Sequence, residues 1–278
     1  MKTKIPALLI PSLLLLLLSS CKGGSDLVAQ NQLIDSIITI DTTAFKPIQY
    51  DSSKKYIYLT LDDAPQPPGT NICKNIFETE GVKATFFLVG MHQFDERRKR
   101  IVDTLRNNYP QFLIANHSFT HGFRNKYKSF YSNPDSAVKD FMRAEAELKL
   151  PEKIIRLPGN NAWVGNGEIR GPKQVLPLCH KLDSLGYSVI GWDVEWQFIN
   201  KGGSIPLQSV DNMLRNINKK LSEGTTNRKD HLVILAHDRM FEKTQYADSL
   251  RKLVSILKQN PHYTFETVDH YPIVQDLK

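Results

Sequence analysis

Cysteine is scarce in this 278-residue chain, which has three, Cys21, Cys73 and Cys179. No Cys-x-x-Cys pair or zinc-finger spacing occurs, which excludes a thioredoxin-like redox pair and a structural zinc finger. Cys73 and Cys179 fall in expected helices far apart in the sequence, and we expect two buried free thiols rather than a disulfide. A chain of this length buries enough apolar surface to fold without such crosslinks.

Long runs of one charge are also lacking. The chain has 36 basic and 29 acidic residues, and its formal net charge is +7. The densest basic patch, residues 97–100, falls within an expected helix and is typical of a solvated face. We therefore expect no nucleic-acid partner.

No apolar run is long enough to cross a membrane, which takes roughly 20 residues. The longest run, residues 5–18, is preceded by two lysines and followed by two serines and Cys21. This order is typical of a secretory signal, and the ending Leu-Ser-Ser-Cys resembles the bacterial lipobox. We expect residues 1–20 to be a lipoprotein signal peptide and Cys21 to be lipidated after cleavage. The protein would then be exported and anchored by its lipid to the cell envelope, facing the periplasm or the cell surface. The alternative is a plain signal peptide with an incidental cysteine.

The rest of the chain divides into residues 21–54, expected to be a tether and N-terminal extension, and one globular domain, residues 55–278. In this domain short β-rich runs alternate with segments of helical period, such as the stripe Leu250, Leu253, Val254 and Leu257. The seven expected strands are 56–61, 84–89, 112–115, 153–157, 187–192, 231–236 and 263–268. This alternation predicts an α/β fold with a parallel sheet, open or closed into a barrel.

Five of these strands run directly into ionisable residues, and their opposite ends have none of this kind. In parallel α/β folds, sites form at the carboxyl ends of the strands. The residues in question are Asp62, Asp63, His117, His121, Arg156, Asp193, Glu195 and His237.

The residue types are mutually consistent. His117 and His121 are four apart, so on a helical turn both imidazoles face the same way. Two histidines and one carboxylate form an open metal site, in which a divalent metal can activate water and polarise a carbonyl. A second carboxylate can act as general base, and another histidine can protonate the leaving group. Taken alone, each feature also has a structural explanation, because an Asp-Asp pair after a strand is usually a turn or cap.

Four motifs and one strand resemble a known family. Segment 60–65 (Thr-Leu-Asp-Asp-Ala-Pro) is similar to its Thr-Phe-Asp-Asp-Gly-Pro motif, and segment 81–90 is similar to its next strand. Segment 117–121 fits His-Ser/Thr-x-x-His, 156–158 fits Arg-x-Pro, and 235–237 fits Leu-x-His. Between residues 56 and 269 the chain resembles the polysaccharide deacetylases of the NodB-homology group, carbohydrate esterase family four.

The resemblance implies a distorted (β/α)7 barrel of parallel strands with a metal at its mouth. Asp63, His117 and His121 would ligate a divalent metal, zinc first, with cobalt, manganese, nickel or iron as alternatives. Asp62 would be the base, kept charged by a bidentate ion pair with Arg156. His237 would protonate the departing amine or alkoxide.

Three departures from the family pattern leave questions open. Ala64 replaces the usual glycine and would be strained if that position needs positive φ. The fourth motif is ambiguous in register, so either Asp193 or Glu195 would orient His237 and raise its pKa. The segment after Arg156 also differs from the family. The expected sugar-binding candidates are Asn160, Trp163, Trp192 and Trp196, with buried packing favoured for at least one tryptophan.

The implied enzyme is a hydrolase that removes acetyl groups from an acetylated polysaccharide, such as peptidoglycan or a chitin-like or xylan-like polymer, at C–N or ester bonds. One alternative is an amide hydrolase of the same fold that acts on a non-sugar substrate. A second is an inactive glycan-binding lipoprotein, which the presence of every expected catalytic residue disfavours.

Overall fold

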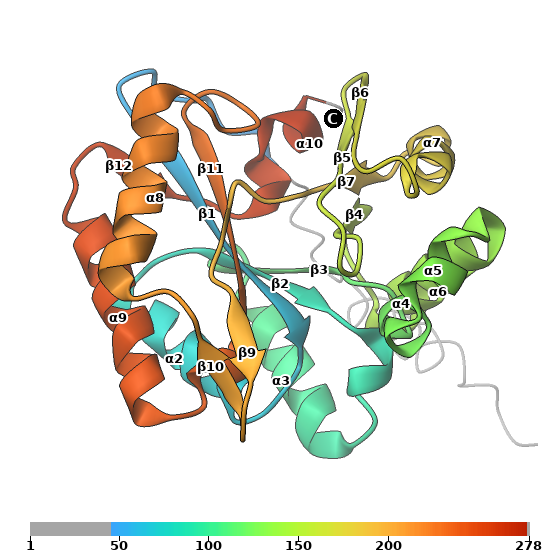
Figure 1. The fold of residues 1–278 in the computed structure, drawn as a ribbon, viewed down its shortest axis with the longest axis horizontal. Helices are drawn as coiled ribbons and strands as arrows, with labels where there is room; N and C mark the ends of the chain where they lie inside the picture. Colours follow the sequence, from blue (N-terminus) through green and yellow to red (C-terminus); the bar gives the residue numbers. More distant parts are fainter. Residues whose placement is uncertain (1–45, 277–278) are drawn as a thin grey trace, which may run out of the picture. The chain divides into compact units, whose positions relative to one another are not determined.

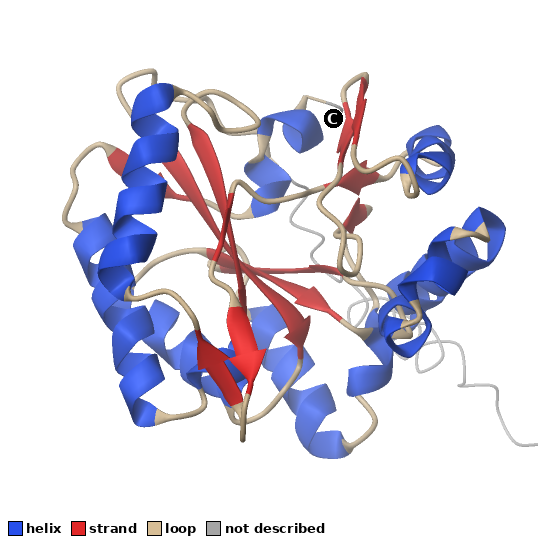
Figure 2. Cartoon of the chain, in the orientation of Figure 1, coloured by secondary structure: helices blue, strands red, loops and turns tan. Residues whose placement is uncertain are grey.

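The structure, a computed structural model, describes residues 46–276. The predicted signal peptide, the lipidation site and most of the predicted tether lie outside the described residues. A curled, mainly parallel sheet occupies the middle of the domain and helices surround it, as Figures 1 and 2 show. The predicted fold class, an α/β fold with a distorted (β/α)7 barrel of the deacetylase type, is confirmed, and the curled sheet forms a half-barrel. Between residues 46 and 276, no helix is long and apolar enough to cross a membrane.

All seven predicted strands are present, and the sheet gains short strands that sequence reasoning missed. Its order is β6 (Glu168–Arg170), β5 (Trp163–Gly165), β7 (Ser188–Val189), β4 (Ile154–Ile155), β3 (Phe112–Asn116), β2 (Ala84–Leu88), β1 (Lys55–Ala64), β11 (His231–His237) and β8 (Val194–Glu195), with β12 (Tyr263–Phe265) also paired to β1. Strands β5 and β6 form an antiparallel hairpin. A second hairpin, β9 (Phe198–Asn200) and β10 (Ser204–Pro206), lies outside the main sheet.

Helices alternate with the strands, as the sequence pattern predicted. The longer ones are α2 (Gly69–Glu80), α3 (Glu96–Asn107), α6 (Pro134–Leu148), α7 (Leu176–Ser184), α8 (Val210–Glu223) and α9 (Thr244–Lys258); the short ones are α4 (His121–Asn125), α5 (Tyr127–Tyr131) and α10 (Pro272–Gln275). Asn133 caps α6, because its side chain accepts a hydrogen bond from the Ser136 N–H and Pro134 occupies the first turn. The unpaired cysteines Cys73 and Cys179 are both buried in helices, as predicted.

The two faces of the sheet have different roles. Successive side chains of a strand point to opposite faces, so in β1 Ile57 and Leu59 pack in the core beneath the helices. Tyr56 and Tyr58 belong instead to an aromatic cluster on the inner face, which also contains Trp163 and Tyr271. The same inner-face register continues through Thr60 to Asp62. The inner face is therefore packed along its length and carries its polar residues at the carboxyl end.

The stripe on α9 provides a test of the core. Leu253 is fully buried there, with Leu250, Val254 and Leu257. We expect Leu253→Ala to lower the free energy of unfolding by about 2–5 kcal/mol, because it removes buried methyl groups and leaves a cavity. Ile256→Ala on the same helix is the control; this side chain is 36% exposed, and its loss is expected to cost less than about 1 kcal/mol. Urea unfolding of both variants checks this. Equal losses would contradict the assignment of the buried face.

Candidate metal centre and active site

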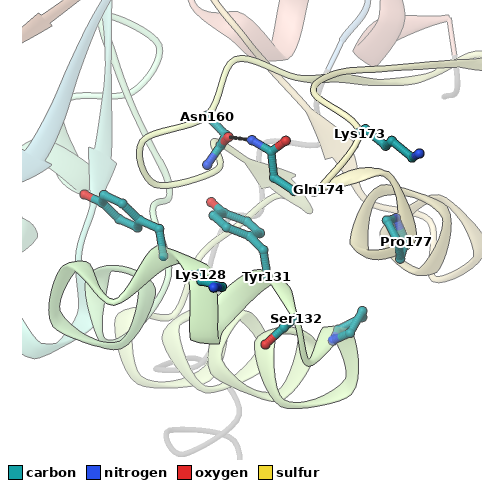
Figure 3. A pocket seen from close by; sticks show the side chains of 9 residues that line it. Lys128, Tyr131, Ser132, Asn160, Lys173, Gln174 and Pro177 are labelled. Atoms are coloured by element: carbon teal, nitrogen blue, oxygen red, sulfur yellow. Dashed lines mark hydrogen bonds between the residues drawn. The ribbon is translucent and has the colours of Figure 1, made fainter.

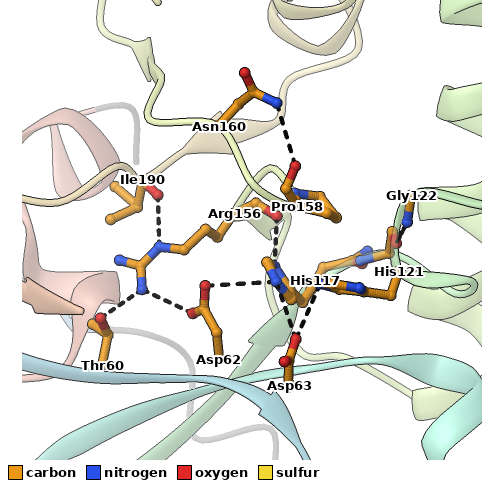
Figure 4. A network of polar contacts seen from close by, with 12 residues as sticks. Thr60, Asp62, Asp63, His117, His121, Gly122, Arg156, Pro158, Asn160 and Ile190 are labelled. Atoms are coloured by element: carbon orange, nitrogen blue, oxygen red, sulfur yellow. Dashed lines mark hydrogen bonds and ion pairs between the residues drawn. The ribbon is translucent and has the colours of Figure 1, made fainter. Parts of the chain in front are cut away.

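Six of the eight polar residues predicted at the strand ends line one hollow of about 500 Å³ at the mouth of the half-barrel; the exceptions are Arg156, which is buried behind Asp62, and Asp193. Asp62 and His237 are register partners on the adjacent parallel strands β1 and β11. Figure 4 shows Asp62, Asp63, His117 and His121 directed toward one another. The hollow is lined by Asp62, Asp63, Gln66, His92, His117, His121, Asn125, Tyr127, Gly159, Trp192, Glu195, Phe198, Leu235, His237 and Arg239.

A bulge brings the two adjacent aspartates to the same side of β1. In a regular strand they would point to opposite faces. The pairing of β1 with β2 shifts register between Leu61 and Ala64, and Asp63 has a φ of 71°. Asp tolerates this left-handed conformation better than most residues. The possible strain that the sequence placed at Ala64 therefore falls on Asp63, and Ala64 has no positive φ.

The two histidines lie together, but not on the helical turn that their spacing suggested. His117 directly follows β3, and His121 begins α4, in which Gly122, Phe123 and Arg124 have positive φ. The expected helical turn from His117 to His121 is wrong, because Ser118 and His121 within it have positive φ, 68° and 51°. The rings nevertheless lie 5.1 Å apart, centroid to centroid.

Hydrogen bonds fix which nitrogen of each imidazole faces the centre. His117 Nδ1 lies 3.0 Å from the Arg156 carbonyl oxygen, and His121 Nδ1 lies 2.5 Å from Asn125 Oδ1. Because both partners are acceptors, each Nδ1 carries the proton and each Nε2 lone pair points inward. His121 Nε2 lies 3.1 Å from Asp63 Oδ1, and His117 Nε2 lies 3.7 Å from it.

This arrangement fits a divalent cation. Asp63 Oδ1 is buried without a hydrogen-bond partner, although buried carboxylate oxygens are normally satisfied. One ligand atom from each of Asp63, His117 and His121 lies within 4.8 Å of the others. The pKa of Asp63 is also consistent with a cation site. Burial alone would raise this pKa, but the neighbouring histidines have the larger effect and hold it far below its usual range. Asp63 in turn raises the pKa of His121 in spite of burial. The three groups thus favour a positive charge between them.

Asp62 has a different environment from its neighbour. Arg156, which is fully buried, donates from Nη1 to Asp62 Oδ1 at 3.0 Å, and its other N–H groups donate to the Ile190 and Gly191 carbonyls. The predicted bidentate ion pair is therefore wrong, because only one guanidinium nitrogen reaches the carboxylate (Figure 4). Burial raises the pKa of Asp62, and the Arg156 charge opposes this shift. A carboxylate with a raised pKa accepts a proton more readily than an ordinary one.

His237, on the strand next to Asp62, lacks the carboxylate partner that the sequence predicted. Asp193 accepts from the backbone N–H groups of Asn227 and Val233, so its predicted pairing with His237 is wrong. Glu195 lines the hollow, but His237 Nδ1 is buried without a hydrogen-bond partner. Burial lowers the pKa of His237, opposite to the predicted increase.

Of the four predicted sugar-binding residues, only Trp192 lines the hollow. Trp196 is 1% exposed and contacts Phe241, and Trp163 is 4% exposed and stacks on Tyr271. Both rings are held in the core, so a sugar-stacking role for them is not supported. Asn160 lines a second hollow of about 570 Å³, shown in Figure 3, where it accepts a hydrogen bond from Gln174.

Sequence reasoning missed four residues that surround the centre. Asn125 orients His121, and Tyr127 donates to the same Asn125 oxygen at 3.1 Å. His92 contacts the Asp63 carbonyl oxygen through Nδ1 at 2.7 Å. Arg239 brings its Nη2 within 3.7 Å of Asp63 Oδ2. Asn125 and Arg239 lie four and two residues from a predicted site histidine, and this proximity was the available signal.

Comparison with known proteins agrees with this geometry. Residues 49–153 match the family model described as polysaccharide deacetylase. That segment contains Asp62 and the three residues of the cation site, whereas Arg156 and His237 lie beyond it. The predicted enzyme class, a hydrolase of the carbohydrate deacetylase kind, is confirmed by this match and by the relative described next.

A relative that matches most of the chain extends the likeness past residue 153. The chain is 26% identical to the chitin disaccharide deacetylase of Vibrio alginolyticus over an alignment 309 positions long. The alignment covers 79% of this chain and 72% of that protein.

Solved structures share the fold at lower identity. A carbohydrate esterase family four esterase from Streptococcus mutans has a TM-score of 0.58 and 24% identity, with 77% of this chain and 86% of that chain covered. A family four acetyl xylan esterase from Clostridium thermocellum, solved with a cobalt ion, has a TM-score of 0.53 and 21% identity, with 80% and 90% covered.

Proposed function

We propose that this protein is a metal-dependent deacetylase that hydrolyses N- or O-linked acetyl groups of a polysaccharide. The observation that carries the proposal is the buried set of Asp63, His117 and His121 beside Asp62, with His237 on the neighbouring strand. Two imidazoles and one carboxylate leave coordination positions open, as catalytic rather than structural metal sites do. The polysaccharide deacetylase match over residues 49–153 supports the same reading.

Each residue has a separate role in this proposal. Asp63, His117 and His121 hold the divalent metal, which when bound acts as a Lewis acid and lowers the pKa of water. Zinc is the first candidate for this metal, because two imidazoles and one carboxylate are ligands that suit it. Asp62 accepts the proton of the attacking water, because its raised pKa suits a base and Arg156 holds it in place. His237 delivers a proton to the departing nitrogen or oxygen of the sugar.

The surroundings of the centre favour an extended substrate. Tyr127 lines both the catalytic hollow and the second hollow, so the two lie against one side chain. Its ring is held tightly: a Cβ added at Gly122 or Gly159, both at positive φ, would come within 2.9 or 3.0 Å of it. An aromatic wall shared by the two hollows suits neighbouring sugar units of one chain.

The experiment that tests the proposal is acetate release by the purified full chain. The substrates are peptidoglycan, chitin oligomers and acetylated xylan, assayed with zinc and with a chelator. Metal-dependent release from at least one of them is the expected result. Release only from a non-sugar acetamide would favour the amide hydrolase alternative. Glycan binding without any release would favour an inactive binding protein.

We also propose that the protein is exported and anchored to the cell envelope through Cys21. The support is the segment 18–21, Leu-Ser-Ser-Cys, after a basic start and a short apolar run. We expect Cys21→Ser to remain unprocessed and without lipid. Metabolic labelling with a radioactive fatty acid and the gel mobility of both forms check this. Wild-type protein that carries no label and is fully soluble outside the cell would contradict the anchor.

A further inference from the structure

One positively charged side chain in the catalytic hollow, that of Arg239, has no role in the proposed reaction. The Arg239 side chain is 32% exposed and lines the hollow with Asp62, Asp63 and His237. Its guanidinium carbon lies 4.7 Å from the centre of the Phe198 ring, in the range of a cation–π contact. The edge of the same ring contacts His237, with centroids 4.9 Å apart. Phe198 therefore places this guanidinium beside the proposed acid.

The backbone that carries Arg239 is rigid. It lies in the short 3-10 helix η2 (Asp238–Phe241), between the fully buried residues Asp238 and Met240. The Thr70 hydroxyl donates to the Asp238 carboxylate, and a Cβ at Gly69 would come within 2.4 Å of the Asp238 carbonyl oxygen. This packing fixes the point of the backbone from which the Arg239 side chain extends.

The ring that supports Arg239 is also anchored. The β9–β10 hairpin is closed at its base by a hydrogen bond of 2.9 Å from Trp196 Nε1 to the Gln208 carbonyl. Trp196 packs edge-on against Phe241 of η2, with centroids 5.3 Å apart. The carrier of Arg239 and its stacking partner are thus joined through one buried contact.

The hydrogen-bonding capacity of this guanidinium is unused. Among residues 46–276, none accepts a hydrogen bond from the Arg239 side chain, and its Nε is buried without a partner. The distance of 3.7 Å to Asp63 Oδ2 is an ion pair but too long for a direct hydrogen bond. Arg143, which also stacks on a phenylalanine, differs in this respect, because its Nε donates to Glu147 at 2.7 Å. Beside its ion pair with Asp63, Arg239 therefore keeps N–H donors that a ligand in the hollow can use.

We infer that Arg239 is a carboxylate-binding residue of the catalytic hollow, an inference that rests on the proposed function. A guanidinium presents two parallel N–H groups that match the two oxygens of a carboxylate. Hydrolysis of an acetyl group with one water gives acetate and the free sugar amine or hydroxyl, so a carboxylate is produced within this hollow. A carboxylate on the sugar polymer itself has the same chemistry, and the two sources need separate experimental arms.

The test uses the zinc-loaded full chain as wild type, Arg239→Met, Arg239→Lys and the control Arg143→Met. The first arm titrates [13C]acetate and measures its affinity by NMR line broadening. The second arm compares KM for a neutral acetylated oligosaccharide with KM for one whose sugars carry carboxylates. Metal content and melting temperature establish that each variant is folded and loaded.

A loss of acetate affinity of about tenfold or more in Arg239→Met, with a smaller loss in Arg239→Lys, supports acetate as the ligand. A similar rise in KM confined to the carboxylated oligosaccharide supports the polymer. Both quantities equal to those of Arg143→Met would overturn the inference. The proposed function fails separately, if the wild type releases no acetate from any substrate, because the acetate titration needs no turnover.

Discussion

Asp62→Asn is expected to lower kcat for acetate release by about 10²–10⁴-fold while the chain keeps its metal. Asparagine preserves the size of the side chain and one acceptor oxygen for Arg156 Nη1, which lies 3.0 Å from Asp62 Oδ1. It cannot take a proton from water, so only the general base is lost. The measurement pairs acetate release with elemental analysis of the same preparation.

Asp63→Asn is the matched control for this result. It changes the adjacent residue in the same isosteric way, but Asp63 Oδ1 belongs to the cation site. We expect this variant to lose metal affinity and to regain part of its activity in excess metal. If Asp62→Asn loses the metal and Asp63→Asn keeps it, the two roles are exchanged. If both variants remain fully active, the reaction does not take place here.

His117→Ala is expected to remove the metal almost completely. His117 contributes one of the three ligand atoms, and its ring is fixed by the Arg156 carbonyl. Loss of an outer partner of a metal ligand typically costs about 10–100-fold in affinity, and loss of the ligand itself is expected to cost at least that much. Elemental analysis after dialysis should show about one metal per wild-type chain and almost none in the variant.

Two further variants sharpen this prediction. Asn125→Ala leaves all three ligands but removes the acceptor of His121 Nδ1, so we expect a weakened site that still fills in excess metal. His180→Ala removes an exposed imidazole of α7 and is expected to bind metal like the wild type. A His117→Ala protein that retained stoichiometric metal would show that the cation binds elsewhere.

The sequence predicted where the site lies because that depends on topology. Strand β1 runs into Asp62, and its register partner on β11 is His237. The alternation of strands and helices determines that such carboxyl ends meet at one edge of the sheet. The stripe on α9 was predictable for a similar reason, because burial of one helix face follows from its apolar period.

The details of the site depend on irregular backbone, which periodicity does not encode. The bulge at Asp63 turns two adjacent carboxylates to one side, and positive φ at Ser118 and His121 replaces an ordinary helical turn. Neither follows from residue spacing. Likewise, Asp193 satisfies two backbone N–H groups of a loop, a contact that only the tertiary structure reveals.

Aromatic residues show the same limit. Trp163 and Trp196 are near site residues in the sequence, yet their side chains point into the core. Phe198, on a hairpin that the alternation pattern did not reveal, contacts both His237 and Arg239. Proximity in sequence to a catalytic residue therefore did not identify which rings face the hollow.

Metal titration of the chelated full chain tests whether a single metal held by Asp63, His117 and His121 drives deacetylation. Acetate release from the best substrate is followed as zinc is added. We expect no acetate release before zinc is added and a rise that saturates at one zinc per chain, with no such rise in His117→Ala. Full acetate release by the chelated, metal-free protein would contradict it.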